Sequence, residues 1–266
     1  MAYNLEFNWY PGHIAKAERQ LREKISQVDL IIELRDSRIP LSSAHADLLE
    51  WAKQKPVITV FTKADLADPN KMPKGIVINS KDKSGFKNLF IEIEKLAKPI
   101  LEKYQSKGVV NRATKLMIVG YPNIGKSSLI NAIAGNKKAK VEDRPGVTRS
   151  QQWIDLKSKF PLKLLDTPGI IPSKLYSTEQ ALKLAMSNAI PEAAYDVTSV
   201  ARAAIDLIES LYPGAIQAYY RSPKSELEAI ALSRNWLLEG QPDLHKAAVK
   251  FIEDFRDAKI GKISLD

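Results

Sequence analysis

A phosphate-binding loop is the sequence feature most directly tied to chemistry. Residues 120–127 read GYPNIGKS and fit the pattern GxxxxGK[S/T], with an apolar run before the loop and a helix-like segment after it. In such a loop the backbone N–H groups face phosphate oxygens, the lysine adds a positive charge and the serine hydroxyl can bind Mg²⁺. Ser127 is therefore the expected magnesium ligand of the loop. The expected phosphate-binding residues are Asn123, Ile124, Gly125, Lys126, Ser127 and Ser128.

Two further segments would complete a magnesium and γ-phosphate site. Residues 166–169 read DTPG at the end of an apolar run and match DxxG, in which the aspartate holds Mg²⁺ through water and the glycine amide contacts a γ-phosphate. These roles fall to Asp166 and Gly169. The loop between the two motifs contains Thr148, whose hydroxyl can close on Mg²⁺ and on the γ-phosphate when a triphosphate is bound.

A candidate base-binding motif lies upstream of the phosphate loop. The segment TKAD follows the apolar run PVITVF, and the segment NSK follows the run GIVI. The carboxylate of Asp65 would accept hydrogen bonds from the two N–H groups that distinguish guanine, and the backbone of NSK would meet the guanine O6. The expected base-binding residues are Thr62, Lys63, Ala64, Asp65, Asn79, Ser80 and Lys81.

The order of these motifs leaves two interpretations. In an ordinary GTPase the phosphate loop comes first and the base motif near the end, whereas here the base motif comes first. Either TKAD is an accidental Lys-Asp turn, which would leave an ATP-using P-loop enzyme, or the domain is circularly permuted. Permutation is favoured because residues 28–80 and 115–165 together supply the strands of a doubly wound sheet, and because no base motif follows Asp166.

Hydrophobic periodicity predicts two domains. The expected strands, marked by short apolar runs, cover residues 28–34, 56–61, 75–78, 116–119, 153–156 and 162–165. A helix-like segment at 14–28 precedes the first strand, and others at 42–53 and 85–104 lie between strands. This pattern predicts an α/β fold over residues 1–176, a GTPase domain whose mostly parallel six-stranded sheet has helices on both faces. Strand signals disappear from about residue 178, so residues 177–266 are expected to form a small all-helical domain.

Composition restricts the class of protein. The chain has 266 residues, 44% hydrophobic and 27% charged, which excludes a disordered or fibrous chain. Because cysteine is absent, disulfides, thiolate metal sites and cysteine nucleophiles are excluded. Neither an apolar targeting core nor a membrane-length apolar run is present, so we expect a cytoplasmic protein. Residues 1–176 hold 30 Lys and Arg against 18 Asp and Glu. This excess favours a nucleic-acid partner, although it is also typical of solvated surface lysines.

As an ordered set, these motifs resemble the YlqF/RbgA family of circularly permuted GTPases, which act in assembly of the large ribosomal subunit. The resemblance covers essentially the whole chain and includes the segments WYPGHIAKA, DSRIP, TKAD, GYPNIGKSS, PGVTRSQQW and DTPGI, followed by a helical tail. DSRIP at residues 36–40 is similar to the family's DARxP, whereas Thr62 departs from the usual asparagine of NKxD.

The resemblance implies a GTP-binding and GTP-hydrolysing assembly factor that cycles on and off a precursor of the large ribosomal subunit and contacts its rRNA. Neither a membrane nor DNA is expected as a partner. The alternative is a nucleotide-dependent RNA-binding switch with negligible hydrolysis.

The resemblance also implies a catalytic role for His13. A Ras-like enzyme orients its attacking water with a glutamine shortly after DxxG, but Ile170 stands directly after that motif here. The family assigns this task to the histidine of W[F/Y]PGH, which corresponds to His13. The alternative is that His13 is a surface or helix-cap residue. Asn123 is implied to help hold K⁺ beside the phosphates; otherwise it is a polar loop residue. The expected cofactors are GTP or GDP, Mg²⁺ and K⁺.

Overall fold

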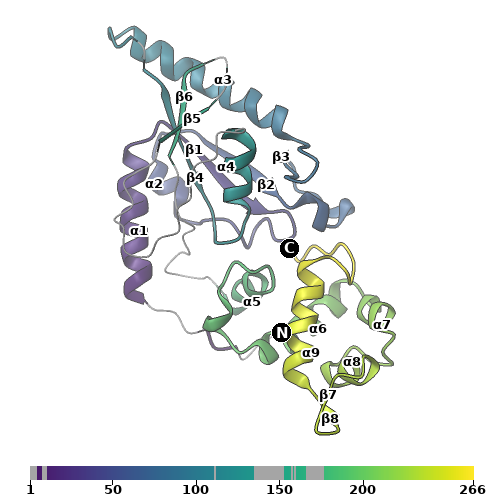
Figure 1. Cartoon of the computed structure of the whole chain (residues 1–266). Coiled ribbons are helices and arrows are strands. Elements are labelled where there is room, and N and C mark those ends of the chain that lie inside the picture. The colour runs from purple at the N-terminus through teal and green to yellow at the C-terminus, as the bar shows by residue number, and fades with distance from the viewer. Residues whose placement is uncertain are drawn as a thin grey trace.

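A six-stranded sheet forms the centre of the computed structural model (Figure 1). The structure describes residues 5–7, 11–110, 112–134, 153–156, 158, 160–165 and 177–266, and only the backbone of residues 11–15 and 134. Within them the strands of this sheet are β1 (Leu30–Asp36), β2 (Val57–Thr62), β3 (Ile76–Val77), β4 (Thr114–Val119), β5 (Trp153–Leu156) and β6 (Leu162–Leu165). Their order is β3-β2-β1-β4-β6-β5, and β5 alone among them pairs antiparallel to its neighbour.

The strand order confirms the predicted permutation. β4, which leads into the phosphate loop, pairs with β1 on one side and with β6 on the other. The strands β1, β2 and β3 come first in the chain but extend one side of the sheet outward from β4. Because β1, β2 and β4 are parallel, their carboxyl ends meet at one edge of the sheet, which is where ligands bind in doubly wound folds.

Helices cover both faces of the sheet, as predicted (Figure 1). In this part of the chain the helices are α1 (Pro11–Ser26), α2 (Leu48–Ala52), α3 (Phe86–Gln105) and α4 (Lys126–Ala134). Successive side chains of a strand point to opposite faces. Ile31 of β1 accordingly packs with the residues of α1 and α2, whereas its neighbours Leu30 and Ile32 pack with those of α3 and α4.

The C-terminal part of the chain is helical except for one hairpin. Its helices are α5 (Thr178–Met186), α6 (Val197–Leu211), α7 (Ala215–Tyr220), α8 (Leu227–Ser233) and α9 (Leu244–Arg256). Ser177, Asp196 and Asp243 start α5, α6 and α9 by accepting a backbone N–H three residues ahead. The hairpin of β7 (Leu237–Leu238) and β8 (Gln241–Pro242) was not predicted. Its two-residue loop, Glu239 and Gly240, has positive φ at both positions (51° and 80°), which matches the twist of a tight hairpin.

The C-terminal segment returns to the sheet beside a predicted helix that is shorter than expected. The backbone N–H of Leu265 donates to the Arg38 carbonyl oxygen at 2.8 Å. The Asp266 carboxylate accepts from the backbone N–H groups of Leu41 (2.7 Å) and Ser42 (2.9 Å). These contacts hold the chain after β1 in turns. The helix predicted over residues 42–53 begins only at Leu48 and covers the five residues of α2, since the His45 backbone N–H donates to the Glu33 carboxylate at 2.9 Å and not to a helical carbonyl.

Candidate nucleotide site

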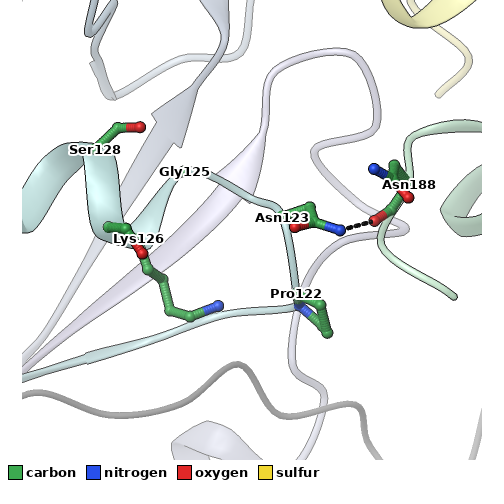
Figure 2. A pocket seen from close by; sticks show the side chains of 7 residues that line it. Pro122, Asn123, Gly125, Lys126, Ser128 and Asn188 are labelled. Carbon is green, nitrogen blue, oxygen red and sulfur yellow. Dashed lines mark hydrogen bonds between the residues drawn. The ribbon is translucent and has the colours of Figure 1, made fainter. Parts of the chain in front are cut away.

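The phosphate loop borders a cavity of about 500 Å³ beyond the carboxyl end of β4 (Figure 2). The cavity is lined by Pro122, Asn123, Gly125, Lys126, Ser127, Ser128 and Asn188. Of the six phosphate-binding residues predicted in the loop, five are in this lining, while the sixth, Ile124, has its side chain in the core. Because α4 begins at Lys126, the loop ends at a helix N-terminus, where free backbone N–H groups and the helix dipole favour an anion.

The loop takes its shape from two residues with left-handed backbone conformation. Asn123 has φ 54° and Gly125 has φ 104°. Asparagine visits the left-handed region more readily than most residues, and glycine has no Cβ to oppose it. A Cβ at Gly125 would come no closer than 3.7 Å to Thr62, which is an ordinary contact distance. Glycine is therefore required at this position by the backbone angle and not by crowding.

Lys126 brings a buried positive charge to the loop. Its side chain is only 8% exposed. The ammonium nitrogen donates to the carbonyl oxygens of Gly120 (3.1 Å) and Tyr121 (2.5 Å), both at the start of the loop. A cation shielded from water in this way acts on a nearby phosphate more strongly than a solvated lysine would.

Asn188, which the sequence did not indicate, brings the helical part of the chain to the phosphate loop. The Asn123 side-chain amide donates to the Asn188 carbonyl oxygen at 2.9 Å (Figure 2). Asn188 follows α5 and has φ 64°. Its one sequence signal is that asparagine is common in left-handed conformation just after a helix. That signal predicts a helix end and says nothing of a nucleotide site.

Thr62 joins the base motif to the phosphate loop. Its hydroxyl donates to the Ile124 carbonyl oxygen at 2.6 Å and lies 3.1 Å from the Arg35 carbonyl oxygen. Thr62 is 2% exposed, so these bonds are shielded from water. The threonine that replaces the usual asparagine thus makes a direct hydrogen bond between the two motifs.

The two predicted base-binding segments meet through an ion pair. The Asp65 carboxylate lies 2.7 Å from the Lys81 ammonium, and this hydrogen bond raises the pKa of Lys81. Asp65 belongs to the short 3₁₀ helix η1 (Ala64–Leu66), which begins directly after β2. Asn79 shapes the other segment, because its side-chain oxygen accepts the backbone N–H of Lys81 at 3.0 Å. Ser80 is exposed between them.

Several predicted site residues lie outside the described part of the chain. These are Thr148, Asp166, Gly169 and the side chain of His13, of which only the backbone within α1 is described. The predicted magnesium ligand Ser127 lines the cavity, but the two residues expected to share the ion with it are among these. Among the residues that the structure describes, no cluster of three or more His, Asp or Glu side chains could hold a metal ion. No helix among them is long and apolar enough to span a membrane.

Comparison with known proteins gives matches in sequence and in structure. The model of a family described as 50S ribosome-binding GTPase matches residues 115–220. Ribosome biogenesis GTPase A of Bacillus cereus is 36% identical over 276 residues, covering 97% of this chain and 93% of that protein. Its counterpart from Bacillus pumilus is 34% identical and covers 98% and 99%. The GNP-bound crystal structure of YlqF from T. maritima superposes with a TM-score of 0.64 at 24% identity, over 94% of this chain and 97% of that one, and so shows the same fold.

Proposed function

The chain belongs to the ribosome biogenesis GTPase A family, and from this premise we propose that it hydrolyses GTP on a precursor of the large ribosomal subunit and then leaves the particle. Guanine-nucleotide binding and GTP hydrolysis are the activity of the family. The large subunit as partner is supported by the description of the matching family model as a 50S ribosome-binding GTPase. The excess of Lys and Arg in residues 1–176 supports contact with rRNA.

The hydrogen bond between Thr62 and the Ile124 carbonyl oxygen is the observation that carries the nucleotide assignment. It fixes the base motif beside the phosphate loop, so that one nucleotide can contact both. In this arrangement the Asp65 carboxylate accepts from the guanine N–H groups, and the backbone of residues 79–81 meets O6. The triphosphate lies in the cavity against Lys126.

Hydrolysis proceeds by attack of water on the γ-phosphorus, with cleavage of the bond to the bridging oxygen and release of GDP and phosphate. Lys126 and the N–H groups at the start of α4 stabilise the negative charge on the phosphate oxygens. Ser127, Asp166 and Thr148 are the residues that would hold Mg²⁺, which adds further positive charge when bound. The Gly169 amide would contact the γ-phosphate.

Two further assignments concern the attacking water and a monovalent cation. We assign His13 the orientation of the water, since Ile170 follows DTPG and offers no polar group for this task. A neutral imidazole can orient water and accept its proton. We assign Asn123 the role of a K⁺ ligand beside the phosphates, because its side chain lines the cavity.

We further propose a division of labour along the chain. Residues 1–176 form the nucleotide-binding domain, and residues 177–266 form a helical domain that contacts the ribosomal particle in the cytoplasm. The contact between Asn123 and Asn188 supports communication between the two, because it places the helical part at the rim of the phosphate cavity.

GTP turnover in potassium buffer, with and without purified large ribosomal subunits, tests the proposal. We expect subunits to accelerate hydrolysis by the wild type strongly, and we expect His13→Ala to lose that acceleration. Acceleration that persists in His13→Ala would keep the partner and remove His13 from the mechanism. If subunits have no effect on the wild type, the proposed partner is wrong.

Base recognition has its own test. Asp65→Asn removes the carboxylate that accepts from the guanine N–H groups and should shift preference from GTP to xanthosine triphosphate. Unchanged preference would show that TKAD does not bind the base.

A further inference from the structure

The carboxylate of Asp36, at the end of β1, is shared between two cations. Its two oxygens accept from Arg38 Nε at 3.0 Å and Arg38 Nη2 at 2.9 Å, and the Lys63 ammonium lies 3.0 Å from Oδ2. Asp36 and Arg38 are at most 1% exposed. Burial by itself would raise the pKa of the Asp36 carboxyl, yet Arg38 and Lys63 together lower this pKa well below its usual range.

One of these cations, Arg38, connects Asp36 to the C-terminal helix α9. The Arg38 Nη1 donates to the Arg256 carbonyl oxygen at 3.3 Å, and the guanidinium carbon lies 5.2 Å from the centre of the Phe255 ring. The Arg38 backbone carbonyl accepts from Leu265. Arg38 is therefore fixed from three sides, and a bidentate arginine fixes its carboxylate partner in turn.

The other cation, Lys63, belongs to the base motif and has an unusual backbone. Its φ is 56°, in the left-handed region, and it immediately precedes the turn η1 that contains Asp65. A residue other than glycine in this region costs about 1–3 kcal/mol and persists only where its surroundings hold it. The backbone bond from Leu66 to the Lys63 carbonyl oxygen, at 3.0 Å, is one such restraint, and the ion pair with Asp36 is the other.

We propose that Asp36 is a positioning residue of the base site. It holds Lys63 in the conformation from which η1 presents Asp65, and Arg38 anchors Asp36 against α9. This inference rests on the proposed base site and extends it to the segment DSRIP, for which the nucleotide motifs supply no role. If the ion pair were merely structural, loss of Asp36 would affect only the stability of the fold. In a positioning role, loss of Asp36 also weakens nucleotide binding through Lys63.

Steady-state hydrolysis of GTP by the full chain separates the two cases. In Asp36→Asn the neutral amide no longer balances the Lys63 ammonium. We expect KM for GTP to rise about tenfold, as typical for a lost hydrogen bond between charged groups, with kcat within about twofold of the wild type. An unchanged KM would overturn the inference.

Asp29→Asn is the matched control. Asp29 lies just before the other end of β1, roughly 23 Å from Asp36 by the rise of a strand, and pairs with Arg112 at 3.0 Å. The substitution Asp29→Asn therefore also takes a partly buried carboxylate away from an arginine, but at a distance from the base motif. We expect Asp29→Asn to leave KM unchanged. A similar rise of KM in both variants would mean that general loss of stability is the cause, and would refute a positioning role.

A double-mutant cycle tests whether the effect passes through Lys63. Lys63→Met removes the ammonium, so adding Asp36→Asn to it should leave KM unchanged. A further tenfold rise in the double variant would refute the route through Lys63. If Asp36→Asn alone does not fold, Asp36→Asn combined with Arg38→Met removes both charges of the buried pair, which proteins often tolerate. That variant still lacks the partner of Lys63, and the same rise of KM is expected.

The base-preference experiment with Asp65→Asn keeps the inference and the base site apart. If Asp65→Asn fails to shift preference to xanthosine triphosphate, the base site is wrong. If it does shift preference while Asp36→Asn leaves KM at the wild-type value, only the role of Asp36 is wrong.

Discussion

Thr62→Val is the most direct test of the link between the base motif and the phosphate loop. Valine has nearly the shape of threonine but no hydroxyl, so it removes the 2.6 Å bond to the Ile124 carbonyl oxygen. Thr62 is 2% exposed, so water cannot replace the lost donor without rearrangement. The expected loss is about 1–2 kcal/mol, the range for a hydrogen bond whose buried acceptor is left unpaired.

This loss should divide between folding and binding. If about 1 kcal/mol of the lost free energy weakens nucleotide binding, because the base motif and the phosphate loop are no longer joined, the Kd for GDP rises about fivefold. Urea unfolding of the nucleotide-free protein measures the loss of folding stability, and titration with fluorescent GDP measures the loss of nucleotide affinity. Thr59→Val is a matched control on the same strand, since the Thr59 hydroxyl lies 3.3 Å from Glu33 and has no bond to the phosphate loop. Unchanged GDP affinity in Thr62→Val, or an equal change in Thr59→Val, would refute the argument.

Three other predictions concern a turn, a cation and a buried histidine. Gly85→Ala should lower the free energy of unfolding, measured by urea titration, by about 2–4 kcal/mol. The φ of Gly85 is 78°, and the added Cβ would lie 1.9 Å from a backbone oxygen of β3. Gly214→Ala, with φ 80° and no atom within 4 Å, should lose only about 1 kcal/mol. Asn123→Ala should abolish the advantage of KCl over NaCl in GTP turnover; an undiminished advantage would exclude Asn123 as a K⁺ ligand. Burial lowers the pKa of His45, so below about pH 6.5 the unfolded state binds the proton more readily than the folded state. The free energy of unfolding therefore decreases as the pH is lowered, by up to about 1.4 kcal/mol per pH unit. In urea titrations at pH 7.5 and 5.5, His45→Phe should reduce this fall; a fall as large as that of the wild type would contradict the assignment.

Features that depend on short stretches of sequence, such as the strands and the motifs at their ends, could be predicted from the sequence. Apolar runs located the strands, and the carboxyl ends of parallel strands share one edge, so the meeting of TKAD with the phosphate loop followed from the predicted permutation. The direct bond between Thr62 and the Ile124 carbonyl oxygen is a consequence of that geometry. The base and phosphate segments were therefore predictable as neighbours from the order of the motifs and the strands that carry them.

Features that depend on packing between distant segments were not predictable. Nothing near Asn188 indicates that its carbonyl oxygen accepts from Asn123, because the contact depends on where α5 ends against the sheet. The helix predicted over residues 42–53 is present but begins later than expected for a similar reason, since the His45 backbone N–H donates to Glu33 of β1. Asp36 stands out in the sequence only as part of a motif. Its ion pair with Lys63 depends on the register of β1 against β2, which the sequence leaves open because β1 is buried on both faces and shows no alternation.

The position of β4 in the sheet has a consequence for synthesis of the chain. The ribosome delivers strands in chain order, so β1, β2 and β3 are made before the strand that pairs with the other side of β1. Until then that side of β1 presents free N–H and C=O groups, a template for wrong pairing between nascent chains. β1 also contains Glu33 and Arg35, paired at 2.7 Å in the folded protein. Charged side chains on an edge strand oppose aggregation, and β1 carries these two charges while its neighbour on that side is still being made.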